Sequence, residues 1–213
     1  GEIIMKALRF YDVQDLRYED APDPVIEKPD DVIVKVKAVG ICGSDIARYR
    51  NLGPYVPGNV WGHEFCGEVV EVGEGVKNLK PGDRVVGCPN MVCHECEYCK
   101  SGHPSRCENL NTIGAYVPGA YAEYIKLPEI NFVKMADSMS YEQGALVEPA
   151  TVAIHGLYQT SIKMGYEVAV VGCGNIGLMA IAWGESFRSK ESNFAIDIDD
   201  AQLQLAKELE LTF

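Results

Sequence analysis

The residues with the clearest chemical meaning are four cysteines that crowd into one short stretch. Cys93, Cys96, Cys99 and Cys107 follow the spacing C-x2-C-x2-C-x7-C. Four thiolates at such spacing can close a tetrahedron around zinc, with Zn–S distances of about 2.3 Å. A site closed by four protein ligands has no open coordination position. We therefore predict a structural zinc in residues 88–110, which we call the cysteine lobe.

Other interpretations of the same stretch stay open. His94 and His103 lie inside it and compete as ligands. An iron–sulfur cluster would also use thiolates, although the spacing lacks the Cys-Pro ending of bacterial ferredoxins. Disulfides are a third alternative, but a tight cluster without a secretory signal is more typical of metal binding in a reducing compartment.

A second group of candidate metal ligands is spread along the chain. Cys42 ends an alternating apolar segment, His63 and Glu64 precede the next one, and Glu148 lies near a change of pattern. Each has an ordinary interpretation, as a core cysteine, a surface pair and the start of a helix. A cysteine, a histidine and a carboxylate are nevertheless the ligand types that an open, catalytic zinc uses.

A third motif predicts a nucleotide site. The sequence Val168–Val171 is a short apolar strand signal, and G-x-G-x-x-G follows it directly. Asp197 comes twenty residues after the last glycine, where a carboxylate can bind the adenosine ribose hydroxyls and repel a 2′-phosphate. A glycine-rich turn of another α/β fold is the alternative. The expected cofactor-binding residues are Gly172, Gly174, Asn175, Ile176, Gly177 and Asp197.

Two kinds of secondary structure must position these residues. Residues 31–39 alternate, with Val32, Val34, Val36 and Ala38 on one face, and short strand signals follow with Gly/Pro turns between them. These further strands are expected at residues 67–72, 83–87 and 121–127. We predict a β-barrel or sandwich-like domain here.

The pattern changes near Tyr141. A helix is expected from there to about Ser161, and an alternation of strands and helices follows. Its expected elements are a strand at 167–171, a helix at 175–187, a strand at 194–196 and a helix at 201–211. Such alternation predicts a parallel α/β unit. We therefore expect a β domain over residues 1–150 and an α/β domain over residues 151–213.

Composition restricts the functional class. The chain has 213 residues, of which 47% are hydrophobic and 23% are charged, so it can bury a core. Its formal net charge of −12 opposes a nucleic-acid surface, which needs a basic face. No uncharged apolar run approaches the roughly 18 residues of a membrane span. The first residues do not form a secretory signal, so we expect a cytoplasmic protein without a nucleic-acid or membrane partner.

In combination these features resemble the zinc-containing medium-chain dehydrogenases, over essentially the whole chain. The matching segments are Cys42-Gly43-Ser44-Asp45, Gly62-His63-Glu64, the cysteine lobe, Gly119-Ala120-Tyr121-Ala122-Glu123-Tyr124, Glu148-Pro149 and Gly172 to Gly177. A glutamate where ethanol-type enzymes use a second cysteine looks like the polyol branch, which includes sorbitol, threonine, butanediol and galactitol-1-phosphate dehydrogenases. The spacing is most similar to that of the galactitol-1-phosphate 5-dehydrogenases.

The resemblance implies a GroES-like β domain, then a Rossmann domain, with the active site in the cleft between them. It implies a catalytic zinc held by Cys42, His63 and a glutamate, with Glu64 and Glu148 exchanging as ligands. Such a zinc acts as a Lewis acid on the substrate hydroxyl. Ser44 is expected to relay the proton away, although it could equally be a helix N-cap.

The resemblance also implies two zinc ions per chain, NAD as hydride acceptor, a small polyol or sugar-phosphate substrate, and a homodimer or homotetramer. Family members continue past residue 213, so we expect the sequence to be a fragment, or the ordered part of a longer chain, with an incomplete Rossmann domain. A non-catalytic zinc-binding module is the main rival, and a zinc ribbon or a zinc-free quinone reductase fits less well. Arg48 and Arg50 could hold a substrate phosphate or could simply be solvated.

Overall fold

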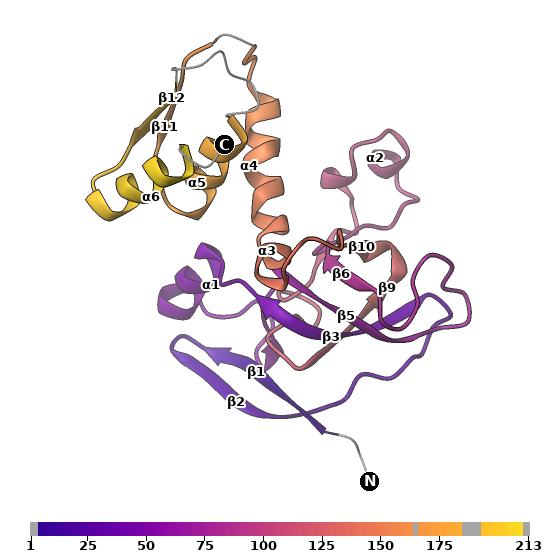
Figure 1. The fold of residues 1–213 in the computed structure, drawn as a ribbon. Coiled ribbons are helices and arrows are strands. Elements are labelled where there is room, and N and C mark those ends of the chain that lie inside the picture. The colour runs from indigo at the N-terminus through magenta and orange to yellow at the C-terminus, as the bar shows by residue number, and fades with distance from the viewer. Residues whose placement is uncertain (1–3, 164–165, 185–192, 211–213) are drawn as a thin grey trace. The chain divides into compact units, whose positions relative to one another are not determined.

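The structure is a computed structural model that describes residues 4–163, 166–184 and 193–210. The chain divides into two compact units, Gly1–Leu146 and Val147–Phe213. The first unit consists mainly of strands, and the second is an alternation of strands and helices (Figure 1). None of the described helices is long and apolar enough to cross a membrane.

The main sheet of the first unit has five antiparallel strands in the order β10-β6-β5-β3-β9. These strands are β3 (Asp31–Val39), β5 (Phe65–Val72), β6 (Arg84–Gly87), β9 (Tyr124–Pro128) and β10 (Phe132–Lys134). The strand predicted at residues 31–39 is confirmed. Those predicted at 67–72 and 83–87 are confirmed to within two residues, whereas β9 begins three residues later than predicted.

The alternation of β3 sets the hydrophobic core of this unit. Val32 and Val34 are fully buried, while Lys35 and Lys37 are exposed, as the pattern predicts. Ile33 is buried as well, because the start of the strand is covered on both faces and a bulge follows it. The valines pack with Phe65, Val69, Val85, Ile125 and Leu127.

A second sheet of the first unit was not predicted. Its strands, in the order β2-β1-β4, are β1 (Ile4–Asp12), β2 (Asp15–Pro22) and β4 (Asn59–Val60). Residues 121–123, predicted as the start of the strand at 121–127, lie along β1 instead of in β9: Leu8 N–H donates to the Tyr121 carbonyl at 2.7 Å. The signal is weak because β2 is mostly exposed and its sequence is largely polar.

Short elements complete the first unit. The cysteine lobe contains β7 (Asn90–Met91), α2 (Glu97–Lys100) and η2 (Pro104–Arg106). β8 (Asn111–Thr112) follows the lobe directly and pairs with β7. The others are α1 (Gly43–Ala47), the π-helix η1 (Arg48–Leu52), η3 (Glu129–Asn131) and α3 (Tyr141–Ala145).

The second unit contains the predicted parallel α/β arrangement. Its elements are α4 (Val147–Gln159), β11 (Val168–Val171), α5 (Asn175–Gly184), β12 (Asn193–Ile196) and α6 (Asp200–Glu210). β11 and β12 pair in parallel, with Val168 opposite Asn193. Cys173, Ile181 and Ala206 form the buried centre of this unit. Residues 185–187, the predicted end of the helix at 175–187, lie outside the described part of the chain.

One predicted helix is two. The pattern from Tyr141 to about Ser161 predicts a continuous helix, but α3 ends at Ala145 with Leu146 as its C-cap, and α4 begins at Val147. α3 starts with a capping box, in which the Ser140 hydroxyl accepts from Gln143 N–H at 3.2 Å and Gln143 Oε1 accepts from Ser140 N–H at 2.9 Å. The break coincides with the division between the two units.

Candidate active site

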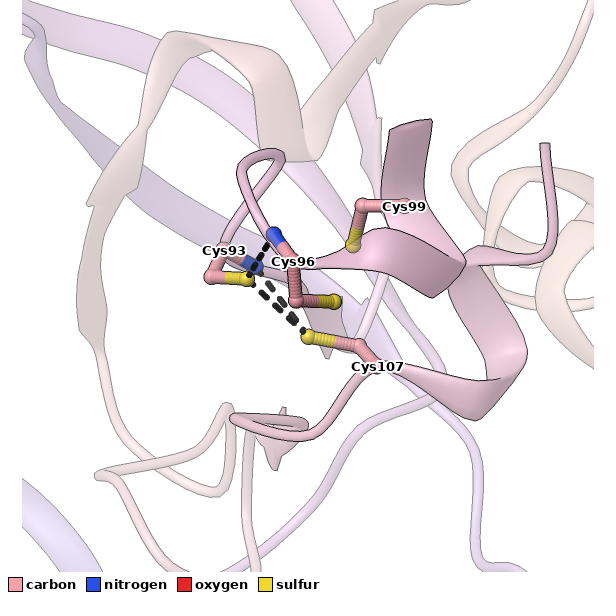
Figure 2. A group of neighbouring side chains, drawn as sticks. All are labelled: Cys93, Cys96, Cys99 and Cys107. Carbon is pink, nitrogen blue, oxygen red and sulfur yellow. Dashed lines mark hydrogen bonds between the residues drawn. The ribbon is translucent and has the colours of Figure 1, made fainter. Parts of the chain in front are cut away.

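The structure brings the four cysteines of the lobe together. The sulfurs of Cys93, Cys96, Cys99 and Cys107 all lie within 4.8 Å of one another (Figure 2). Cys96 is the N-cap of α2, Cys99 lies in α2, and Cys107 is the C-cap of η2. Backbone N–H groups also face the cluster: that of Cys93 donates to the Cys107 sulfur at 3.3 Å. All eight cysteines of the chain are free thiols, so the lobe is not closed by disulfides. Four convergent sulfurs fit a structural zinc ion.

The charge balance of the cluster favours a cation. The N–H groups of Glu95 and Cys96 lower the pKa of Cys93 to about 6. Burial, and then the neighbouring thiols, raise the pKa of Cys99 to about 12. Four thiols this close cannot all lose their protons unless a positive ion compensates the charge. Within the described residues, neither His94 nor His103 belongs to the group of convergent ligand atoms.

A second group unites Cys42, His63 and Glu64, whose ligand atoms also lie within 4.8 Å of one another. The register of the sheet explains how it forms. β3 and β5 are antiparallel neighbours, and Val39 near the end of β3 pairs with Phe65 at the start of β5. The segment after β3 and the segment before β5 therefore meet at the same edge. This is an arrangement of ligand types that fits an open zinc site.

The Glu64 side chain is held in a tight space. It is only 4% exposed, and a Cβ atom at Gly40 would overlap its carboxylate. Gly40 N–H also donates to the Glu64 carbonyl at 2.7 Å, which joins the two ligand-bearing segments. Next to Glu64, a hydrogen bond with His63 and then one with Ser44 lower the pKa of Cys42, which favours the thiolate that a metal ion needs.

A buried carboxylate that the sequence analysis did not select supports this group. Asp45 is 7% exposed, and its Oδ2 accepts from Cys42 N–H at 3.0 Å and from the Tyr121 hydroxyl at 2.7 Å. Its Oδ1 lies 3.8 Å from His63 Nδ1 and has no hydrogen-bond partner among the described residues. A carboxylate beside one imidazole nitrogen orients the ring so that the other nitrogen can bind a metal.

Tyr121, which is distant from Asp45 in the sequence, completes this support. Burial, and then the Asp45 carboxylate, raise the pKa of the phenol, so it stays protonated and donates its hydrogen bond. Its ring packs so closely on Gly62 that a Cβ there would clash, and Gly62 has a φ of 96°. One sequence signal could have found Asp45: it is an acidic residue at the N3 position of a helix whose N-cap is Cys42.

A cavity of about 190 Å³ lies beside the group. Ser44 and His63 both line it, so the predicted proton-relay residue and a predicted ligand face the same space. Ser44 lies in the first turn of α1 and is not its N-cap, since Cys42 has that position. Glu148 lies in the first turn of α4, in the second unit. Glu148 as a zinc ligand therefore stays a prediction.

The glycine motif of the second unit has the expected local geometry. Gly172 follows β11 with a φ of 96°, and a Cβ at Gly177 would overlap the Gly172 carbonyl. A Cβ at Gly174 would meet open space, so a ligand can approach the backbone there. Asn175 and Ile176 open α5, whose N-terminus therefore follows the loop directly.

Asp197 bonds to the backbone of the glycine loop. Its carboxylate accepts from Cys173 N–H at 2.6 Å and from Asp199 N–H at 2.9 Å. These backbone donors lower the pKa of Asp197, so the side chain is charged at neutral pH. The loop and the next strand are thus tied together, because Gly172 N–H also donates to the Ile196 carbonyl at 2.8 Å.

Comparison with known proteins places this geometry in a family. Residues 28–137 match the model of the alcohol dehydrogenase GroES-like domain. Over 213 residues the chain is 37% identical to sorbitol dehydrogenase of Bacillus subtilis, covering 98% of this chain and 60% of that protein. At this coverage the match to sorbitol dehydrogenase extends over both units of the chain.

Solved structures agree with this. Galactitol-1-phosphate dehydrogenase from Escherichia coli aligns with a TM-score of 0.91 and 35% identity, over 96% of this chain and 59% of that chain. A zinc-binding dehydrogenase from Sinorhizobium meliloti 1021, bound to NADP, also aligns with a TM-score of 0.91, at 34% identity over 98% of this chain and 60% of that chain. This chain thus spans about 60% of the length of these relatives.

These likenesses confirm the predicted fold class, a GroES-like domain followed by part of a Rossmann-type domain. They do not single out one substrate, because the relatives are named for different polyols. The chain belongs to the alcohol dehydrogenases with a GroES-like domain, the zinc-type medium-chain alcohol and polyol dehydrogenases.

Proposed function

We propose that the protein containing this chain is a zinc-dependent dehydrogenase that transfers a hydride from a secondary alcohol of a small polyol or polyol phosphate to NAD. The observation that carries the proposal is the convergence of Cys42, His63 and Glu64 beside a cavity, in a member of this family. Relatives named for sorbitol and for galactitol 1-phosphate support the polyol class. Galactitol 1-phosphate is our first candidate, and sorbitol, butanediol or threonine is the alternative.

Two sets of residues would hold zinc. Cys42, His63 and Glu64 would hold the catalytic ion, with Glu148 exchanging for Glu64, and the cysteine lobe would hold the structural one. Bound zinc supplies Lewis acidity toward a substrate hydroxyl, and bound NAD supplies the hydride acceptor. Asp45 keeps the His63 ring oriented, and the hydrogen bond from Tyr121 keeps the Asp45 carboxylate in place.

Ser44 would move the proton of the substrate hydroxyl. Its side chain is exposed and lines the same cavity as His63. The Ser44 Oγ can accept a hydrogen bond from the substrate hydroxyl and pass its own proton toward water.

The glycine loop and Asp197 would bind the adenosine half of NAD. The open space at Gly174 admits the pyrophosphate, and the charged Asp197 accepts hydrogen bonds from the ribose hydroxyls.

Since the Sinorhizobium relative was solved with NADP, cofactor choice needs its own test. We expect kcat/KM to be about 100-fold higher with NAD than with NADP. Asp197→Ser should reduce this ratio. Equal use of both cofactors by the unmodified enzyme would contradict this assignment.

The decisive experiment measures NADH formation with a panel of polyols and polyol phosphates, on zinc-loaded enzyme and after chelation. Turnover that needs zinc and depends on the polyol supports the proposal. If zinc binds but no alcohol in the panel is oxidised, the protein is instead a non-catalytic zinc-binding module.

A further inference from the structure

The cavity that Ser44 and His63 line has one cationic wall, formed by Arg48. Ser44 and Arg48 are four residues apart, where α1 runs into η1, and residues with this spacing share one face of a helix. Arg50, only two residues further, lines a different and mainly apolar cavity with Phe10 and Tyr49. Two arginines of one helical segment therefore face different surroundings.

The guanidinium of Arg48 is held in place before any ligand arrives. One of its nitrogens donates to the Gly53 carbonyl at 2.9 Å. The group also stacks on Tyr55, 3.3 Å from the ring centroid, and the Tyr55 ring lies 4.9 Å from that of Tyr116. Both tyrosines line the same cavity. An arginine fixed in this way loses little conformational freedom when it binds.

Most of the binding capacity of Arg48 is unused. A guanidinium carries five N–H donors, and the Gly53 carbonyl takes one. No ion pair of the described residues includes Arg48, although acidic residues outnumber basic ones by 31 to 19. The other titratable groups of the cavity are Asp45 and His63, whose Oδ1 and Nδ1 atoms lie 3.8 Å apart. The cavity therefore offers an unpaired, partly buried cation.

The dimensions limit what this cation can bind. A cavity of about 190 Å³ is smaller than the roughly 300–1,000 Å³ of sites that enclose whole ligands, so it holds one end of a ligand. Side chains one helical turn apart start about 5–6 Å from each other. A group bound by Arg48 would thus be only a few bonds away from a hydroxyl at Ser44.

We propose that Arg48 binds an oxyanion group on the substrate, a phosphate monoester or a carboxylate, and so selects anionic polyols over neutral ones. Arginine matches the planar, bidentate geometry of both groups. The inference rests on the proposed function and narrows its substrate class. It also assigns Arg50, which faces the apolar cavity, no part in this selection.

The kinetic test compares each neutral polyol of a panel with its terminal phosphate and with the corresponding sugar-acid carboxylate. Native enzyme should show a higher kcat/KM for one of the anionic forms, and the preferred form identifies the oxyanion. Arg48→Gln should lower kcat/KM for that form by about 10- to 100-fold and leave the neutral polyol within about 3-fold. Arg50→Gln, the matched control, removes the same charge from the same segment and should change neither value.

A binding test is independent of turnover. Inorganic phosphate is titrated into zinc-loaded protein by calorimetry, and Arg48→Gln should weaken its binding at least about 10-fold, whereas Arg50→Gln should not. Arg48→Lys keeps the positive charge but not the bidentate geometry, so its phosphate affinity should lie between those of native protein and Arg48→Gln. An intermediate affinity would also show that the weaker binding of Arg48→Gln does not come from a loss of folding.

Two results would overturn the inference: equal kcat/KM for neutral and anionic forms in native enzyme, or equal phosphate affinity in native and Arg48→Gln protein. Failure of the proposed function looks different. In that case no polyol is oxidised, while phosphate binding still depends on Arg48.

Discussion

The two groups of metal ligands in the first unit are built in opposite ways. The cysteine lobe takes all its ligands from residues 93–107, and short turns with little core bring them together. The other group takes Cys42 from the segment after β3 and His63 with Glu64 from the segment before β5. Close spacing in the sequence brings the ligands of the first group together, whereas the pairing register of two strands brings those of the second together.

This difference in construction matches a difference in chemistry. The lobe offers four sulfurs, which complete a tetrahedron and leave no room for a substrate. The strand-edge group, which we define as Cys42, His63 and Glu64, has a buried carboxylate behind it and a cavity in front. A site that must exchange ligands needs rigid support from outside itself, and a pair of core strands provides that support.

The largest expected effect is a loss of activity when the strand-edge group loses a ligand. Cys42→Ser should lower kcat by about 1,000-fold or more, because the Lewis acid of the reaction loses a ligand. The melting temperature should change little, since Cys42 is not part of the core. Cys88→Ser is the matched control, because Cys88 is exposed and belongs to neither group. Full activity in Cys42→Ser would show that the catalytic role is assigned to the wrong group.

The next effect is a loss of stability when the cysteine lobe loses a ligand. Cys96→Ser should remove one of two zinc ions per chain and destabilise the lobe by about 3 kcal/mol or more, because the lobe has little core without its metal. Elemental analysis and limited proteolysis within residues 88–110 measure both consequences. If native protein binds one zinc or less, the assignment of two sites is wrong.

A smaller effect tests the support behind the strand-edge group. Asp45→Asn should weaken zinc binding there by about 10- to 100-fold, while the zinc of the lobe is retained. Tyr121→Phe leaves the Asp45 carboxylate in place and removes the hydrogen bonds of the Tyr121 hydroxyl with Asp45 and with the Gly40 carbonyl, so it should have a weaker effect of the same kind. Metal-competition titrations measure both affinities. An equal loss from both zinc sites in Asp45→Asn would indicate general destabilisation rather than orientation of His63.

The smallest effect concerns the reactivity of two thiols of the first unit, Cys42 and Cys66. Burial raises the pKa of Cys66 to about 11, whereas the hydrogen bond with His63 lowers that of Cys42. A thiol stays protonated below its pKa, so in zinc-free protein at pH 8 iodoacetamide should modify Cys42 and spare Cys66. Peptide mass mapping identifies the modified residues, with denatured protein as the control. Rapid alkylation of Cys66 in the native state would mean that the edge of the sheet opens.

Local patterns in the sequence were enough to predict the elements that carry most of the site. The alternation of residues 31–39, the cysteine spacing and the glycine loop each depend on neighbours within about twenty residues. The same patterns located Gly172 directly after a strand, where the structure has it, and located Cys42 and His63 at strand ends, whereas in the structure they lie two or three residues outside β3 and β5. They failed for the β1–β2 hairpin, because its exposed second strand is polar and has little alternation.

Tertiary structure alone decided how those elements act together. Asp45 is an unremarkable helix residue in the sequence, yet the fold buries it against His63 and Tyr121. Arg48 and Arg50 have the same residue type and nearly the same position, but the turn of the helix places them on different cavities. Sequence spacing determines which residues can share a strand or a turn. Burial, register and helix phase depend on segments that are distant in the chain, so they determine which residues meet.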